Sequence, residues 1–169
     1  VGRMDSLNLI LAHGGVTLTE AEKIAQADIK NDDYVELIKD MNETDLLAGA
    51  REALEAIRAA GLKTGLASAS KNAPAILERL GITDLFDTVV DANLVVNGKP
   101  DPEVFLKGAQ QLGVAAADCI GVEDAVAGVQ SIKSAGMYAI GVGAADVLTQ
   151  ADVVIDGLHH FKLSDYVKG

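Results

Sequence analysis

The sequence predicts an α/β protein built around a parallel β-sheet, with a small helical cap. From residue 46 onward, short apolar runs alternate with amphipathic stretches, a pattern typical of parallel sheets covered by helices. Most of the amphipathic stretches end at a glycine, which is a common helix stop. Before residue 46 the chain is polar and helical in pattern, with no convincing strand. We therefore expect a partial helical cap domain over residues 1–45 and an α/β core domain over residues 46–169.

The cap region should contain short helices. Residues 6–12 are predicted to be helical, with Gly14 and Gly15 as the stop. Thr19 and Glu22 have the spacing of a capping box, which predicts a helix from there to about residue 30. A further turn or helix is expected over residues 34–41. These segments are too few to bury a core alone, so we expect them to rest on the remainder of the chain.

The core region should alternate helices and strands. Helices are predicted over residues 50–60, 73–80, 101–112 and 124–135, and a short final helix over 161–167. Strands are predicted over residues 63–68, 88–90, 119–122, 138–142 and 153–155. Pro102 falls in the first turn of the third of these helices, where its missing N–H costs nothing.

Composition excludes several classes of protein. The chain has 25 acidic and 14 basic residues, a net charge of −11, which argues against nucleic acid as a partner because duplex binding needs clustered Lys and Arg. The single cysteine, Cys119, excludes an internal disulfide framework and indicates a reducing compartment, so we expect a cytoplasmic location. The longest uncharged stretch, residues 134–145, is too short to span a bilayer, and no membrane partner is expected.

The polar residues that follow the first predicted core strand are candidates for a phosphate site, because open parallel sheets bind ligands beyond the carboxyl ends of their strands. Residues 68–72 read Ser-Ala-Ser-Lys-Asn and open a helix. Hydroxyls, an amide and free backbone N–H groups at a helix N-terminus suit a phosphate. The simpler alternative is that Ser70 or Asn72 only caps the helix.

Two more strand ends carry charged residues. Lys99 stands just before a predicted helix, whose N-terminal end carries partial positive charge. A lysine is unfavourable there unless an anion lies close to it, which indicates that Lys99 faces an anionic ligand. A solvated loop lysine is the alternative. Glu123 and Asp124 are adjacent carboxylates, which repel each other unless a cation joins them, and carboxylate oxygens suit Mg²⁺. The alternative for Asp124 is a helix cap. Three such strand ends in one sheet favour a functional site over coincidence.

These residues resemble motifs two, three and four of the haloacid dehalogenase superfamily, whose core is a Rossmann-like parallel sheet. The resemblance is closer to the β-phosphoglucomutase family within it. It rests on residues 66–72, 99–102 and 120–130, together with the cap-like segments 2–6 and 30–34. The resemblance therefore covers nearly the whole chain.

The resemblance implies a phosphomutase that interconverts β-D-glucose 1-phosphate and D-glucose 6-phosphate through an aspartyl-phosphate and glucose 1,6-bisphosphate. It implies that Ser68 and Lys99 hold the phosphoryl group being transferred and that Glu123 and Asp124 bind Mg²⁺. The positions it implies for the second, non-reacting phosphate and its surroundings are Arg3, Lys30, Ala69, Ser70, Lys71 and Asn72. These roles agree with phosphoryl transfer as positioning plus charge neutralisation.

The sequence departs from the family in one respect: the first motif, Asp-x-Asp at the end of an N-terminal strand, does not occur in it. In the family the first Asp is the nucleophile and the second is the general acid and base. We therefore expect this N-terminal strand to be missing from the sequence and this chain alone to be inactive. The missing strand would be supplied either by a separate chain or by residues outside this sequence. The family's missing strand would lie between the strands at 63–68 and 119–122, so these two should not pair directly.

Two alternatives stay open. A sugar-phosphate phosphatase of the same superfamily would share motifs two to four. A catalytically dead fragment that binds phosphorylated sugars would explain the absent nucleophile. The combination of Arg3 with Lys71 and Asn72 favours the mutase, because a bisphosphate that turns round in the site needs a second phosphate position.

Overall fold

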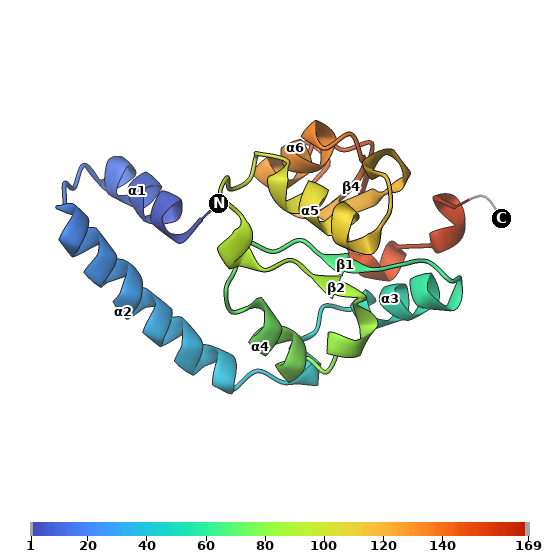
Figure 1. The fold of residues 1–169 in the computed structure, drawn as a ribbon, viewed down its shortest axis with the longest axis horizontal. Coiled ribbons are helices and arrows are strands. Elements are labelled where there is room, and N and C mark those ends of the chain that lie inside the picture. Colours follow the sequence, from blue (N-terminus) through green and yellow to red (C-terminus); the bar gives the residue numbers. More distant parts are fainter. Residues whose placement is uncertain (1, 168–169) are drawn as a thin grey trace.

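The computed structural model describes residues 2–167, which form an α/β part and a projecting helical lobe (Figure 1). Strand β1 (Gly65–Leu66) pairs in parallel with β2 (Thr88–Val89). Strand β3 (Ile120–Glu123) pairs in parallel with β4 (Tyr138–Val142), and β4 with β5 (Val153–Ile155). The parallel α/β architecture predicted from the alternating pattern is confirmed.

The lobe consists of α1 (Arg3–Gly14) and α2 (Glu20–Lys39), which project to one side of the α/β part (Figure 1). The capping box is confirmed: the Thr19 hydroxyl accepts the Glu22 N–H at 3.3 Å, and the Thr19 N–H donates to the Glu22 carboxylate at 2.7 Å. The prediction of two helices over this stretch was wrong, because α2 continues to Lys39. Residues 30–34 contain neither glycine nor proline, so nothing in them breaks the helix.

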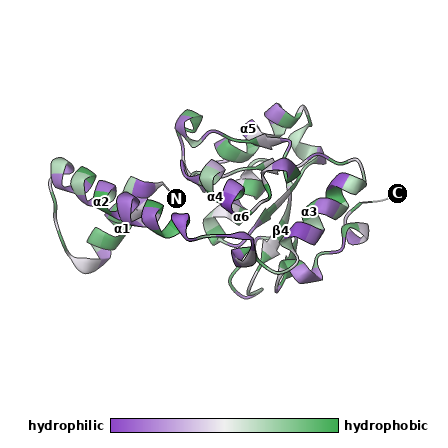
Figure 2. Ribbon diagram, turned by 90° about the horizontal axis from the view of Figure 1, so that it is seen from below, coloured by the Kyte–Doolittle hydropathy of each residue, from purple (hydrophilic) through white to green (hydrophobic). Residues whose placement is uncertain are grey.

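Four further helices cover the strands: α3 (Ala50–Ala59), α4 (Ala73–Arg79), α5 (Glu103–Leu112) and α6 (Val126–Ser134). Helix α5 contacts β1 and β2, helix α6 contacts β3 and β4, and the two helices contact each other. Their apolar faces turn inward, as the hydropathy colouring shows (Figure 2). The most deeply buried side chains include Val104 of α5, Ile132 of α6 and Ile140 of β4. These helices therefore hold the two sheets together through a shared apolar layer.

The strands β4 and β5 have the predicted bounds, whereas β1 is shorter than predicted and β3 begins one residue later and includes Glu123. β1 pairs only with β2, and β3 only with β4, within residues 2–167. As expected, β1 and β3 do not pair with each other. A strand that pairs along one edge only is often short. The backbone N–H and C=O groups on its other edge form no ladder hydrogen bonds, so each added residue stabilises the strand less.

Two helix predictions near strand ends were wrong. Helix α6 begins at Val126, because Ala125 is extended and serves as its N-cap, so Asp124 lies outside the helix. In place of the predicted helix over 161–167 the structure has a 3₁₀ turn at Leu163–Asp165, and another 3₁₀ turn, Leu158–His160, precedes it. Seven residues span fewer than two α-helical turns and no side chain caps them, so helix nucleation is unfavourable.

The remaining regular elements are short 3₁₀ turns in the connections, at Glu43–Asp45, Thr83–Leu85, Ala92–Leu94 and Ala116–Asp118. Among the helices of residues 2–167, none has the length and apolar character needed to cross a bilayer.

Candidate active site

Lys99 and Glu123 form an ion pair at the carboxyl end of β3. Lys99 Nζ lies 2.5 Å from Glu123 Oε2, and the two side chains are 15% and 12% exposed. Lys99 Nζ also lies over the ring of Phe105, 4.9 Å from its centroid. The simpler interpretation of Lys99 as a solvated loop lysine is therefore wrong. The structure brings these two sequence-predicted residues together.

The loop that carries Lys99 is held at both of its ends. The carboxylate of Glu103 accepts the N–H groups of Val96 and Asn97 at 2.9 and 2.7 Å. Hydrogen bonds from Lys107 and from these two backbone N–H groups lower the pKa of Glu103 to about 2.

Beyond Lys99, the fully buried Ser131 hydroxyl donates to the carbonyl of Asp101 at 2.6 Å, which ties the loop to α6. A loop fixed on both sides of a lysine presents the ammonium with little loss of side-chain and backbone freedom on ligand binding.

Glu123 is positioned by the glycine that faces it. A Cβ at Gly128 would lie 2.1 Å from Glu123 Cδ, so only glycine there lets the carboxylate lie against α6. The sequence analysis did not identify Gly128 as a residue that contacts a site carboxylate. Asp124 follows directly, is exposed, and donates its N–H to Glu123 Oε1 at 3.3 Å. Its interpretation as the N-cap of the next helix is wrong, since Ala125 holds that position.

The residues after β1 form a compact polar turn. Ser70 N–H donates to Ser68 Oγ at 3.1 Å, and Asn72 N–H donates to Ser70 Oγ at 3.2 Å. Asn72 occupies the N-cap position of α4, but its side chain makes no cap hydrogen bond. The turn thus satisfies its backbone locally through the two serines, and the Asn72 amide is directed elsewhere.

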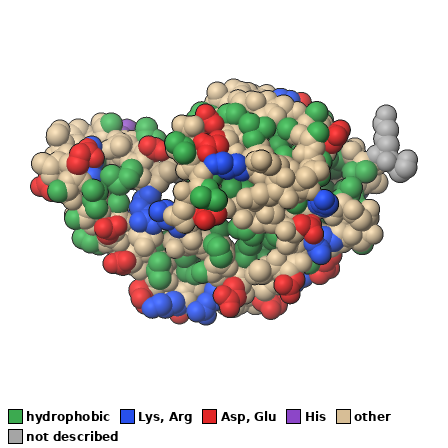
Figure 3. Space-filling view, in the orientation of Figure 1, with side chains coloured by type: hydrophobic (Ala, Val, Ile, Leu, Met, Phe, Trp, Pro, Cys, Tyr) green, Lys and Arg blue, Asp and Glu red, His purple; other side chains and the backbone are tan. Residues whose placement is uncertain are grey.

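The Asn72 amide reaches the helical lobe. Its Nδ2 donates to Asn31 Oδ1 at 3.2 Å, and Arg3 Nη2 donates to the same oxygen at 2.6 Å. Arg3 also lies 3.9 Å from Asp28. Asn31 therefore joins α1, α2 and the start of α4. Figure 3 shows Lys and Arg side chains near the hollow between the lobe and the α/β part. Sequence reasoning quoted residues 30–34 for their resemblance but did not select Asn31.

Among residues 2–167, the other predicted phosphate-binding residues form no hydrogen bond across the junction between the lobe and α4. Lys30 Nζ lies over the ring of Tyr34, 5.1 Å from the centroid. Lys71 is exposed, and Ala69 lies half-buried in the turn between the two serines. Within residues 2–167, the geometry thus gathers Arg3 with Asn72, and Lys99 with Glu123, as two separate polar groups.

The donor set at the end of β3 fits a hard divalent cation. Glu123 and Asp124 supply carboxylate oxygens from adjacent residues, and Gly128 leaves room for the Glu123 side chain to lie over the helix. Mg²⁺ prefers such oxygens and keeps several waters when few protein ligands are present. Lys99 Nζ contacts Glu123 Oε2, so a positive charge already lies beside one of the two carboxylates.

Comparison with known proteins identifies the family of the chain. A family model described as a haloacid dehalogenase-like hydrolase matches residues 2–136. The chain therefore belongs to the haloacid dehalogenase-like hydrolase family.

Two curated relatives and one solved structure show which members of the family the chain is similar to. The chain is 45% identical over 157 residues to a β-phosphoglucomutase of Bacillus subtilis, covering 92% of this chain and 70% of that protein. It is 33% identical to the fructose-1-phosphate phosphatase YqaB of Escherichia coli, covering 79% and 83%. Among solved structures, a β-phosphoglucomutase from Clostridium difficile superposes with a TM-score of 0.93 at 41% identity, covering 98% of this chain and 75% of that one.

Proposed function

We propose that this chain forms most of a phosphomutase that interconverts β-D-glucose 1-phosphate and D-glucose 6-phosphate through glucose 1,6-bisphosphate. The observation that carries the proposal is the pair of separate polar groups, one around Lys99 and Glu123 and one around Arg3 and Asn72. A phosphatase needs one phosphate position, whereas a bisphosphate that reverses its orientation needs two. The 45% identity to the Bacillus β-phosphoglucomutase supports the same activity.

In this mechanism the chain's own residues position and neutralise charge. Ser68 donates its hydroxyl hydrogen to an oxygen of the transferring phosphoryl group, and Lys99 gives a charge-assisted hydrogen bond to another. Glu123 and Asp124 hold Mg²⁺, which supplies positive charge to the phosphoryl oxygens when bound.

The non-reacting phosphate would be held by Arg3 and Lys30 of the lobe together with the polar turn of Ser70, Lys71 and Asn72. Support comes from Arg3 and Asn72, whose side chains both donate to Asn31. The backbone N–H of Ala69 adds a donor in the same turn. Because Arg3 and Asn72 already converge on Asn31 Oδ1, a phosphate oxygen that takes the place of this acceptor receives two donors at once.

The nucleophile of the proposed reaction is an Asp of an Asp-x-Asp strand that residues 1–169 do not contain. We place this strand between β1 and β3, supplied as a further segment or a separate chain. Support comes from the pairing: each of these strands uses one edge for its ladder within residues 2–167. Without that strand the chain has no phosphoryl acceptor and should be inactive.

A phosphatase is the second candidate, and the likeness to fructose-1-phosphate phosphatase over 83% of that protein favours it. The deciding experiment uses a chain extended at its amino terminus by a strand carrying Asp-x-Asp. With β-glucose 1-phosphate, Mg²⁺ and glucose 1,6-bisphosphate, a mutase yields glucose 6-phosphate in a dehydrogenase-coupled assay, and a phosphatase yields only free phosphate.

The matched control for this assay is the same extension with Asn-x-Asn. Release of free phosphate alone by the Asp-x-Asp chain would reject the mutase. Sugar-phosphate binding with no turnover of any kind would instead identify a non-catalytic binding fragment.

A further inference from the structure

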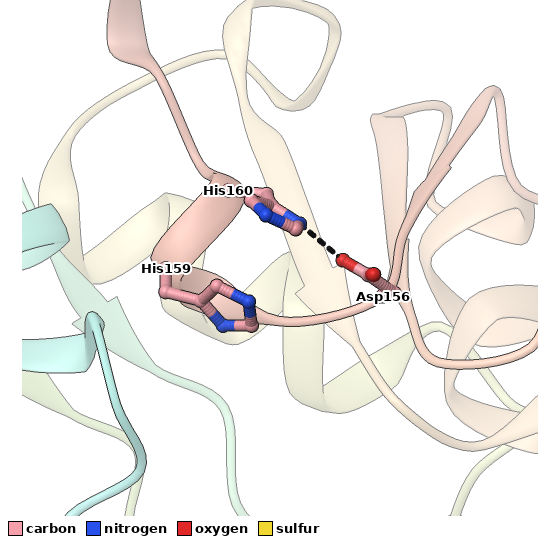
Figure 4. Close-up of side chains that lie close together, drawn as sticks. All are labelled: Asp156, His159 and His160. Carbon is pink, nitrogen blue, oxygen red and sulfur yellow. Dashed lines mark hydrogen bonds and ion pairs between the residues drawn. The ribbon is translucent and has the colours of Figure 1, made fainter.

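A second cluster of ligating side chains follows β5, separate from Lys99 and Glu123. Asp156, His159 and His160 each offer one ligand atom, and these atoms lie within 4.8 Å of one another. Figure 4 shows His160 and Asp156 joined by a hydrogen bond, with the ring of His159 beside them. All three side chains are exposed, and the two imidazole centroids are 4.1 Å apart.

The backbone around the cluster is shaped for this arrangement. A Cβ at Gly157 would lie 2.5 Å from Cε1 and 2.6 Å from Nδ1 of His159, so glycine leaves the space that the ring occupies. A Cβ at Gly49, which precedes α3, would lie 2.4 Å from the backbone nitrogen of His159. The 3₁₀ turn Leu158–His160 is therefore packed closely against the start of α3, and the histidine backbone has a fixed place.

The chemistry of the three donors selects the ion. Two imidazole nitrogens and one carboxylate oxygen suit zinc, nickel or copper, whereas Mg²⁺ prefers an all-oxygen shell. Three protein ligands leave a position for water in a tetrahedral zinc site. An entering metal ion would take the place of the hydrogen that His160 shares with Asp156. Because the three ligand atoms already lie within 4.8 Å of one another, small side-chain rotations bring them to the ion.

We propose that Asp156, His159 and His160 form a binding site for a divalent transition-metal ion of the zinc class. The site differs in donor type from the carboxylate pair at Glu123 and Asp124, so the two discriminate between zinc-class ions and Mg²⁺. A bound ion would link β5 to the turn that packs on α3, and an ion that binds the folded state raises its thermal stability.

The test is a Zn²⁺ titration by calorimetry on the whole chain in excess Mg²⁺, which occupies oxygen-only sites. We expect one Zn²⁺ per chain and a rise in Tm on saturation. His159→Ala and His160→Ala should each weaken Zn²⁺ binding by about tenfold or more. The matched control is His13→Ala in α1, which removes the third histidine of the chain and should leave Zn²⁺ binding unchanged.

Gly157→Ala tests whether the position of the His159 ring matters for metal binding. It keeps all three ligands and an extended backbone that alanine adopts freely, yet it displaces the His159 ring. We expect weaker Zn²⁺ binding with an unchanged Tm in the absence of Zn²⁺. Wild-type chain that binds no Zn²⁺ in excess Mg²⁺ would overturn the proposal. So would binding that survives the double variant His159→Ala/His160→Ala.

Discussion

Lys99 Nζ lies 2.5 Å from Glu123 Oε2, and this ion pair joins the loop before α5 to the last residue of β3. Both side chains are largely shielded from water, so each charge depends on the other to offset its lost hydration. The same two groups are the ones that we propose to contact the phosphoryl group and the metal ion. The pair therefore links the stability of the fold to the chemistry of the site.

Lys99→Met should destabilise the protein by about 2 kcal/mol, because it leaves the Glu123 carboxylate shielded and unpaired. Glu123→Gln in the same chain should restore more than half of this loss, since no uncompensated charge is then left. Urea denaturation of the two single variants and the double variant measures the coupling. Additive effects would show that the two charges do not depend on each other.

In the chain extended by an Asp-x-Asp strand, Lys99→Met should also lower kcat about 100-fold.

Gly128→Ala should weaken Mg²⁺ binding, because the new Cβ would lie 2.1 Å from Glu123 Cδ and displace the carboxylate. Gly108→Ala is the matched control. It is also a buried glycine in a helix, but its Cβ would meet only Val90 Cγ2 at 3.6 Å, an ordinary contact. Calorimetric Mg²⁺ titration of both variants checks the prediction. Equal Mg²⁺ affinities would mean that the position of Glu123 does not matter for the metal.

Asp124→Asn should weaken Mg²⁺ binding more than Glu123→Gln does. Asp124 is exposed, and its carboxylate can turn freely to an ion, whereas Glu123 shares its charge with Lys99. With two protein carboxylates in the site, Mg²⁺ should be held weakly until an Asp-x-Asp strand is supplied. The measurement is the Mg²⁺ concentration for half-maximal activity of the extended chain. The same half-maximal concentration for Asp124→Asn and wild type would remove Asp124 from the metal site.

Glu103 should make stability depend on acid pH. Its pKa falls from 4.5 to about 2 on folding, because Lys107 and two backbone N–H groups donate to the carboxylate. A lowered folded pKa stabilises the protein above the unfolded value, and this contribution is lost as pH falls from about 4.5 to about 2. Urea denaturation should show wild type losing more stability than Glu103→Gln across this range.

The control for the Glu103 experiment is Glu55→Gln, at an exposed position of α3. This variant should follow the wild-type pH profile. If the stability of Glu103→Gln fell with pH in parallel with that of wild type, the Glu103 carboxylate would not stabilise the loop that carries Lys99.

Asn31→Ala should loosen the junction between the lobe and α4, because Asn31 Oδ1 accepts from both Arg3 and Asn72. We expect faster hydrogen exchange in α1 and α2 with little change in the exchange of α5 and α6, since the apolar core does not include Asn31. The control is Asn93→Ala, an exposed asparagine in a 3₁₀ turn. Unchanged exchange in the lobe would show that other contacts hold it.

Some elements of the site were predictable and others were not. The residue types at the ends of β1 and β3 pointed to a phosphate and a cation, because those chemistries need hydroxyls, cations and carboxylates there. The involvement of Asn31 was not predictable from helix periodicity, since its partners come from α1 and α4. The role of Gly128 was also missed, because a glycine in a helix predicts close packing but not which side chain fills the space.

The sequence by itself determined the local structure: the capping box at Thr19, the glycine stops, and the bounds of β4 and β5. These depend on neighbours a few residues away, so a pattern contains the needed information. Only the tertiary structure decided that Lys99 contacts Glu123, that the Asn72 amide reaches Asn31, and that the His159 and His160 rings turn toward Asp156. Such contacts depend on how separate elements pack and how side chains turn, and no spacing along the chain fixes either.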